Sequence, residues 1–145
     1  MDLIKIKDIY SSPSYNSKIV VAGWVRAFRG NRFIELNDGS TIQNIQCVIT
    51  DSNSDNKIIK KINVGSSLKI QGTLIESIGK GQTFEIEIID IEILGESDPD
   101  KYPIQPKKHS FEFLREQAHL RIRTSTFSAV MRIRSKLAFG VHQFF

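Results

Sequence analysis

Short runs of alternating apolar and polar residues, separated by Gly, Asn and Asp, make up most of residues 18–94. A period of two places one set of side chains on each face of an extended chain, so the alternation predicts β-strands with one buried face. The turn residues Gly30-Asn31 and the segment Asn37–Ser40 favour a meander of the first three strands. Five strands are expected, at residues 18–29, 32–36, 42–50, 67–75 and 83–94.

The last of these runs, TFEIEIIDIEIL, changes phase part-way along its length. Ile86 and Ile88 share one face, whereas Ile89, Ile91 and Ile93 share the other. We therefore expect either a β-bulge in this strand or a change in the face that is buried. Bulges of this kind let the strands of a small barrel turn its corners.

One short helix is predicted between the third and fourth strands, in the segment DSNSDNKIIKKINV. Ser54 or Asp55 can cap it, and Ile58, Ile59 and Ile62 recur at helical spacing. Three strands, a helix and two more strands within about 100 residues are the element order of an OB-fold, a partly open five-stranded barrel. The predicted fold class is therefore mainly β.

The net charge of +4 hides an uneven distribution. Residues 1–100 carry 11 Lys and Arg against 14 Asp and Glu, a net charge of −3, whereas residues 101–145 carry 9 against 2, a net charge of +7. A nucleic acid site in the first part therefore needs a local cationic patch. The stretch from Lys18 to Arg32 is such a patch, because no acid occurs between Lys18 and Glu35.

An aromatic and an amide side chain follow the three arginines of this patch. Arg26, Arg29 and Arg32 supply cations for phosphate. Phe33 supplies a π-face on which a base can stack, and Gln46 supplies an amide for a base edge, so the parts of a site for single-stranded nucleic acid are present. From the residues alone the alternatives stay open: Phe33 could lie in the core, and Gln46 could be an ordinary exposed residue.

The number of cysteines and the hydropathy of the sequence limit the remaining classes of protein. Cys47 is the only cysteine, so a disulfide or a multi-cysteine zinc site is not expected, and we predict a buried apolar role for it. The three histidines show no metal-binding spacing. No apolar run has the length of a membrane span and the N-terminus MDLIKIKD lacks the apolar core of a signal peptide, so we expect a cytoplasmic protein without a membrane partner.

A change of composition predicts two domains, at residues 1–98 and 110–145. Three of the four prolines fall in the polar stretch GESDPDKYPIQPKK, and residues 99–109 are predicted to be a linker. After it, Ser110 can cap a helix that runs to Ala118. A longer helix capped by Thr124 or Ser125 is apolar over a wide arc and has no terminator, so we expect the second domain to be incomplete.

The run HSFEFLREQAHLRIRTSTF at residues 109–127 and the run GWVRAFRGNRFIELNDGS near the front together resemble the asparaginyl-tRNA synthetases, class II enzymes related to the aspartyl and lysyl synthetases. The resemblance extends from about Lys18 to the end of the chain. It implies that residues 1–98 bind the tRNA anticodon through an OB-fold. It also implies that residues 110–145 begin a class II catalytic domain and include the helix of its first motif.

The same resemblance implies roles for five side chains. Phe33 would stack on an anticodon base, and Gln46 would read the middle uridine. Glu85 would contact the first anticodon base, although from the residues alone it could be part of the exposed face of an edge strand. Arg29 and Arg26 match basic positions at the end of the first strand.

An activity is implied only for a longer parent protein. The parent would be a homodimer that ligates L-asparagine to tRNA(Asn) with ATP and Mg²⁺ through asparaginyl-adenylate. The second and third class II motifs are absent from the 145 residues, so this fragment is expected to be inactive, with no catalytic residue and no cofactor. The alternatives are a stand-alone OB-fold module that binds single-stranded nucleic acid and has a helical interaction tail, and an OB interaction module without a nucleic acid ligand.

Overall fold

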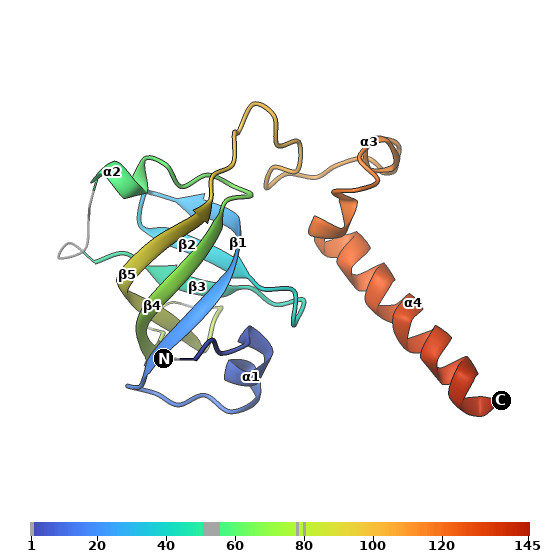
Figure 1. Cartoon of the computed structure of the whole chain (residues 1–145), viewed down its shortest axis with the longest axis horizontal. Coiled ribbons are helices and arrows are strands. Elements are labelled where there is room, and N and C mark those ends of the chain that lie inside the picture. Colours follow the sequence, from blue (N-terminus) through green and yellow to red (C-terminus); the bar gives the residue numbers. More distant parts are fainter. Residues whose placement is uncertain (1, 51–55, 78, 80) are drawn as a thin grey trace. The chain divides into compact units, whose positions relative to one another are not determined.

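The computed structural model describes residues 2–50, 56–77, 79 and 81–145. It divides into two compact units, Met1–Pro106 and Lys107–Phe145. Figure 1 shows the five strands of the first unit and the long helix of the second. The elements are α1 (Ile6–Ser11), β1 (Lys18–Arg29), β2 (Phe33–Asn37), β3 (Ile45–Val48), α2 (Asn56–Ile59), β4 (Ser67–Glu76), β5 (Phe84–Gly95), α3 (Phe111–Glu116), a 3₁₀ helix (Arg121–Arg123) and α4 (Ser125–Phe144).

The five strands form a closed barrel in the order β1-β2-β3-β5-β4, and β5 returns to β1 through β4 (Figure 1). All neighbouring pairs are antiparallel except β3 and β5, which pair in parallel at Cys47 opposite Ile86 and Val48 opposite Glu87. This short parallel contact closes the barrel, which was expected to be partly open. The mainly β, five-stranded fold predicted from the sequence is confirmed.

Inward-facing aliphatic side chains fill the barrel. In β2, for example, Ile34 and Leu36 are fully buried, whereas Phe33 and Glu35 face outward. Cys47 is buried among the core residues, as predicted. The buried cluster within the five strands consists of Ile19, Val21, Val25, Ile34, Leu36, Ile45, Cys47, Leu68, Ile70, Leu74, Phe84, Ile86 and Ile88.

The phase change in the last strand is a β-bulge. Gln71 of β4 lies opposite Asp90, and Gly72 lies opposite Ile88, so Ile89 is an extra residue in β5. Ile89 is 40% exposed, whereas Ile88 is buried. The first of the two predicted explanations is therefore confirmed.

Gly72 makes the close approach at this bulge possible. A Cβ atom at this position would overlap the carbonyl oxygen of Glu87 and a methyl group of Ile86. Since the carbonyl is part of the barrel backbone, it cannot move aside without disturbing the β4–β5 pairing. A glycine is therefore needed at this position of β4.

Two elements of the first unit are shorter than predicted. β3 begins at Ile45 instead of residue 42, because the Asn37 side-chain amide donates to the carbonyl oxygens of Thr41 (3.2 Å) and Gln43 (3.0 Å) and holds that segment as a loop. α2 ends at Ile59, although Ile62, beyond its end, is also buried. The predicted cap residues 54 and 55 lie outside the described residues.

The first unit continues beyond the last strand. Ile104 is buried, and a Cβ atom on Gly65 would lie 2.8 Å from the Tyr102 ring, so the ring packs directly on the backbone at this position. Residues 99–106, predicted to be the first part of a linker, thus lie with the barrel. The proline-rich composition does not predict this packing.

The second unit confirms both predicted helix starts. The Ser110 hydroxyl accepts from the Phe113 N–H (3.2 Å), and the Thr124 hydroxyl accepts from the Phe127 N–H (3.3 Å). α3 ends at Glu116, two residues before the predicted end.

Within the described residues, no helix is both long enough and apolar enough to cross a membrane.

Candidate nucleic-acid interface

Strand pairing brings the outward-facing residues of four strands into adjacent rows. Arg29 of β1 lies opposite Phe33 of β2, and Glu35 of β2 lies opposite Gln46 of β3. Gln46 in turn contacts Glu85 of β5. We call these five side chains, on the outside of β1, β2, β3 and β5, the outer face. It contains four of the five predicted site residues.

Phe33 lies on this surface and not in the core. Its side chain is 37% exposed, whereas Ile34 beside it is completely buried. The Arg32 guanidinium carbon lies 5.9 Å from the centroid of the Phe33 ring, within the range of a cation–π contact. An exposed aromatic ring flanked by arginine can accept a stacked base.

Gln46 and Glu85 form a direct hydrogen bond across the parallel β3–β5 contact. Gln46 Nε2 donates to Glu85 Oε2 over 3.0 Å. The atom of Gln46 that faces the carboxylate must be nitrogen, because two oxygen acceptors would repel each other. A primary amide has a second N–H and a carbonyl oxygen, and neither is paired with any residue that the structure describes, so one donor and one acceptor remain for a ligand.

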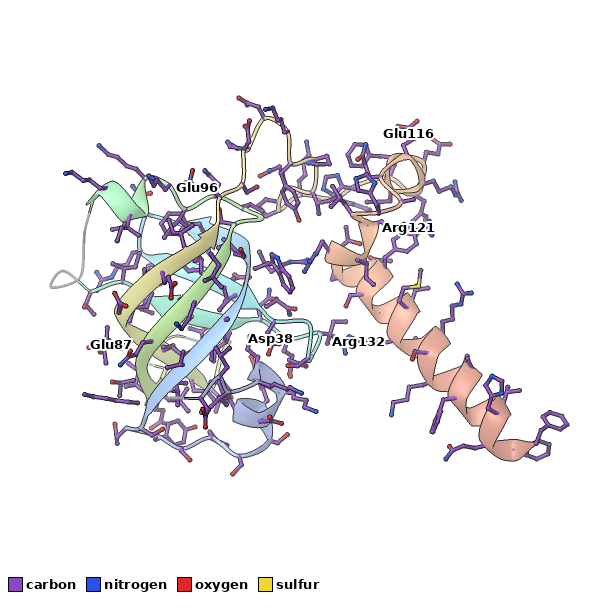
Figure 2. All side chains as sticks on the ribbon, viewed as in Figure 1. Asp38, Glu87, Glu96, Glu116, Arg121 and Arg132 are labelled. Carbon is purple, nitrogen blue, oxygen red and sulfur yellow. The ribbon has the colours of Figure 1, made fainter. Side chains whose placement is uncertain are left out.

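Two further side chains hold the same carboxylate oxygen. Ser77 Oγ donates to Glu85 Oε2 over 3.2 Å, and Gln82 Nε2 donates to it over 3.1 Å. Both residues lie in the connection between β4 and β5. Glu87, two residues further along β5, projects from the barrel (Figure 2) and is exposed.

Arg29 forms an ion pair on the outer face. Its Nη2 atom donates to Glu35 Oε1 over 2.6 Å, and Asn44 Nδ2 donates to Glu35 Oε2 over 3.1 Å. The Arg29 side chain is 62% exposed, so this pair contributes little to folding stability. Its effect is to orient the guanidinium beside Phe33.

Arg26 does not lie with the other four predicted residues. It is the extra residue of a second bulge, because Val25 of β1 lies opposite Leu36, whereas Ala27 lies opposite Glu35. Its side chain lines a small cavity together with Val64, Tyr102, Ile104, Gln105 and Pro106.

The cationic patch of the sequence is also divided. Lys18 pairs with Thr73 at the opposite end of β1 from Arg29. The cationic surface is therefore smaller than the spacing of these residues in the sequence predicts.

Sequence reasoning missed four contributors to this surface: Glu35, Asn44, Ser77 and Gln82. Glu35 could have been found, since the period of two places it on the same face as Phe33. The other three lie outside the strands, where no periodicity predicts the direction of a side chain.

The described residues offer no group of three His, Cys, Asp or Glu side chains able to hold a metal ion. Burial raises the pKa of the Cys47 thiol, and this side chain points into the barrel. The side chains of the outer face offer hydrogen bonding, stacking and charge pairing.

Similarity to known proteins agrees with this geometry. A family model described as the OB-fold nucleic acid binding domain matches residues 19–94. The asparagine–tRNA ligase of Borreliella burgdorferi is 47% identical over 145 residues, and that of Parabacteroides distasonis is 49% identical over 144 residues. Each match covers 97% of this chain and 31% of the relative, so the chain spans about a third of the length of these curated relatives.

Solved structures share the fold. Asparaginyl-tRNA synthetase of Entamoeba histolytica in complex with asparaginyl-adenylate matches with a TM-score of 0.79 at 24% identity, over 99% of this chain and 35% of that chain. The Pyrococcus horikoshii enzyme complexed with asparaginyl-adenylate matches with a TM-score of 0.81 at 21% identity, over 99% and 34%. With the family match over more than half of its length, the chain belongs to the OB-fold nucleic acid binding domain family.

Proposed function

We propose that this chain is the anticodon-recognition part of an asparagine–tRNA ligase and that its outer face binds the anticodon of tRNA(Asn). The observation that carries the proposal is the gathering of Arg29, Phe33, Gln46 and Glu85 on one side of the barrel. The identity of 47% to 49% with asparagine–tRNA ligases, over nearly the whole chain, supports the choice of tRNA among nucleic acids.

Each side chain has a role that suits its chemistry. Phe33 stacks on a base, which contributes roughly 1–3 kcal/mol without selecting its identity. Gln46 reads the middle uridine, because its remaining donor and acceptor match the acceptor and donor of a uracil edge. Glu85 accepts from the N–H groups of a guanine at the first anticodon position, and Arg29 contacts phosphate. Arg26 adds a phosphate contact outside the outer face.

The whole protein would ligate L-asparagine to tRNA(Asn), with ATP and Mg²⁺ used to form asparaginyl-adenylate. This chain supplies anticodon recognition in the unit of residues 1–106 and the start of the catalytic domain in the unit of residues 107–145. No catalytic residue is assigned within it, since the relatives are about three times as long. The whole protein would act as a cytoplasmic homodimer.

The test is binding of the chain to fluorescent anticodon stem-loops that carry GUU, GUC or GAU, at two salt concentrations. We expect GUU to bind most tightly. Phe33→Ala should weaken all three loops by about 5- to 150-fold. Gln46→Ala should remove the preference for GUU over GAU.

Two substitutions serve as matched controls. Phe139→Ala removes an exposed aromatic ring from α4, and Gln71→Ala removes a strand glutamine from β4, away from the outer face. Both should bind like the unmodified chain. If all loops bind alike and only salt matters, the chain is a general module for single-stranded nucleic acid; if none binds, it is an interaction module of another kind.

A further inference from the structure

Three neutral donors converge on one oxygen of Glu85. Gln46 Nε2 lies 3.0 Å from Oε2, Gln82 Nε2 lies 3.1 Å from it and Ser77 Oγ lies 3.2 Å from it. The donors come from β3 and from the β4–β5 connection, so the contact joins segments that are far apart in the sequence. All four side chains are partly buried.

The hydrogen bonds of Ser77 and Gln82 account for all of their side-chain N–H and O–H donors. One N–H of Gln82 reaches Glu85 and the other reaches Ser77 Oγ over 3.2 Å. The single hydroxyl hydrogen of Ser77 points to Glu85, while its oxygen accepts from Gln82 and from the Gly79 N–H (3.1 Å). Neither side chain has a donor left for a ligand, so both act on Glu85 and not on the nucleic acid.

This arrangement leaves the other carboxylate oxygen for a ligand. Among the residues that the structure describes, none donates a hydrogen bond to Glu85 Oε1. The three donors on Oε2 are neutral, so they fix the orientation of the carboxylate without pairing it with a cation. An oriented acceptor of this kind suits a base edge with N–H donors, as in guanine, and it also sets the orientation of the Gln46 amide.

We infer that Ser77 and Gln82 are positioning residues that hold Glu85, and through it Gln46, in the geometry that reads the first and middle anticodon bases. This inference rests on the proposed function, because it assumes that the outer face binds the anticodon. It adds that the two base readings are coupled through Glu85. Loss of either positioning residue should therefore weaken discrimination at both positions.

The test compares stem-loops with GUU, IUU and GCU anticodons on the full chain. Inosine lacks the 2-amino group of guanine, and cytosine reverses the donor and acceptor of uracil. Gln82→Ala and Ser77→Ala should each reduce the preference for GUU over IUU, and for GUU over GCU, by about three- to tenfold. Ser77→Thr keeps the hydroxyl and should restore both preferences.

A neighbouring substitution serves as the matched control. Thr83→Ala removes a hydroxyl from the same connection without removing a hydrogen bond to Glu85, and it should bind like the unmodified chain. Thermal unfolding of each variant checks that the barrel is intact. A double-mutant cycle of Gln82→Ala with Glu85→Gln should be non-additive, because the first change acts through the second residue.

The outcomes separate the two proposals. If the unmodified chain shows no preference among the loops, the proposed function fails and the inference fails with it. If it prefers GUU but Ser77→Ala and Gln82→Ala keep the same ratios, only the inference is overturned. An equal loss of affinity for all loops in these variants would also overturn it, because that result indicates a purely structural role.

Discussion

Arg29 already has an anionic partner on the surface where a phosphate is expected to bind. The 2.6 Å ion pair with Glu35 orients the guanidinium, but it also means that a phosphate must compete with a carboxylate. Glu35 is itself held by Asn44, so it cannot simply turn away. At the residue scale, the pairing of Arg29 with Glu35 therefore weakens binding to the phosphate backbone, which does not depend on the base sequence. Contacts to the bases then decide which nucleic acid binds.

Replacing Glu35 should therefore strengthen binding. Glu35→Gln keeps the shape of the side chain and removes its charge, and one acceptor oxygen then remains in place of the two that accept from Arg29 and Asn44. We expect the affinity for all stem-loops to rise by about two- to fivefold at low salt, with unchanged base preference and a steeper salt dependence. Titrations of GUU and GUC loops over a range of salt concentrations measure this effect.

Glu92→Gln is the control for this prediction. Glu92 of β5 forms a 3.0 Å ion pair with Lys69 of β4, away from the outer face. It should leave the affinity unchanged. Weaker binding by Glu35→Gln would mean that Glu35 is needed to place Arg29 rather than to oppose phosphate.

Cys47 provides a prediction on pH. Burial raises the pKa of its thiol above the ordinary value of 9.0, so the folded state retains the proton more strongly than the unfolded state. The stabilisation is complete below pH 9 and is lost as the pH rises, so the free energy of unfolding should fall by about 1.4 kcal/mol per pH unit above that value. Urea unfolding at pH 8, 9 and 10 measures the slope.

Cys47→Ala removes this titration and should flatten the slope. Burial also raises the pKa of Tyr10, so a smaller decrease caused by this residue should remain above pH 10. In the unmodified chain, the thiol should resist a thiol reagent at pH 8 until denaturant is added. Rapid reaction without denaturant would contradict the buried position.

At the scale of elements, alternation predicted the strands, because burial of one face makes apolar residues recur with a period of two. The phase change in β5 left a bulge as one of two explanations, and the structure has the bulge at Ile89. The turn residues predicted the pairing of β1 with β2 and of β2 with β3, but no pattern predicted the pairing of β1 with β4 or of β3 with β5. The parallel contact of β3 with β5 joins Gln46 to Glu85 across 39 residues, and no local pattern encodes such a contact. The positions of Asn44, Ser77 and Gln82 were unpredictable for the same reason.

The bulge at β4 and β5 makes Gly72 sensitive to substitution. Gly72→Ala would force a methyl group against the Glu87 carbonyl, so we expect the free energy of unfolding to fall by about 1–3 kcal/mol. Urea denaturation measures the loss. Gly140→Ala, in α4 with no atom near its new methyl group, should not lower stability. A Gly72→Ala variant within about 0.5 kcal/mol of the unmodified chain would contradict the close strand approach.

At the scale of the whole molecule, charge and base recognition belong to different parts of the chain. Residues 1–100 have a net charge of −3 and contain the outer face, whereas residues 101–145 have a net charge of +7. A cationic segment raises the local concentration of RNA without selecting a sequence. Affinity at low salt and anticodon preference should therefore be separable.

Removing the second unit should separate them. Residues 1–106 form a compact unit with its own core, so we expect them to fold alone. At low salt this fragment should bind every stem-loop more weakly than the full chain, and the difference should disappear as salt screens the cations. The ratio of GUU to GAU affinities should stay the same at each salt concentration, because Phe33, Gln46 and Glu85 all remain. A fragment that loses this ratio would show that residues 107–145 take part in base selection, and the outer face alone would then be an incomplete site.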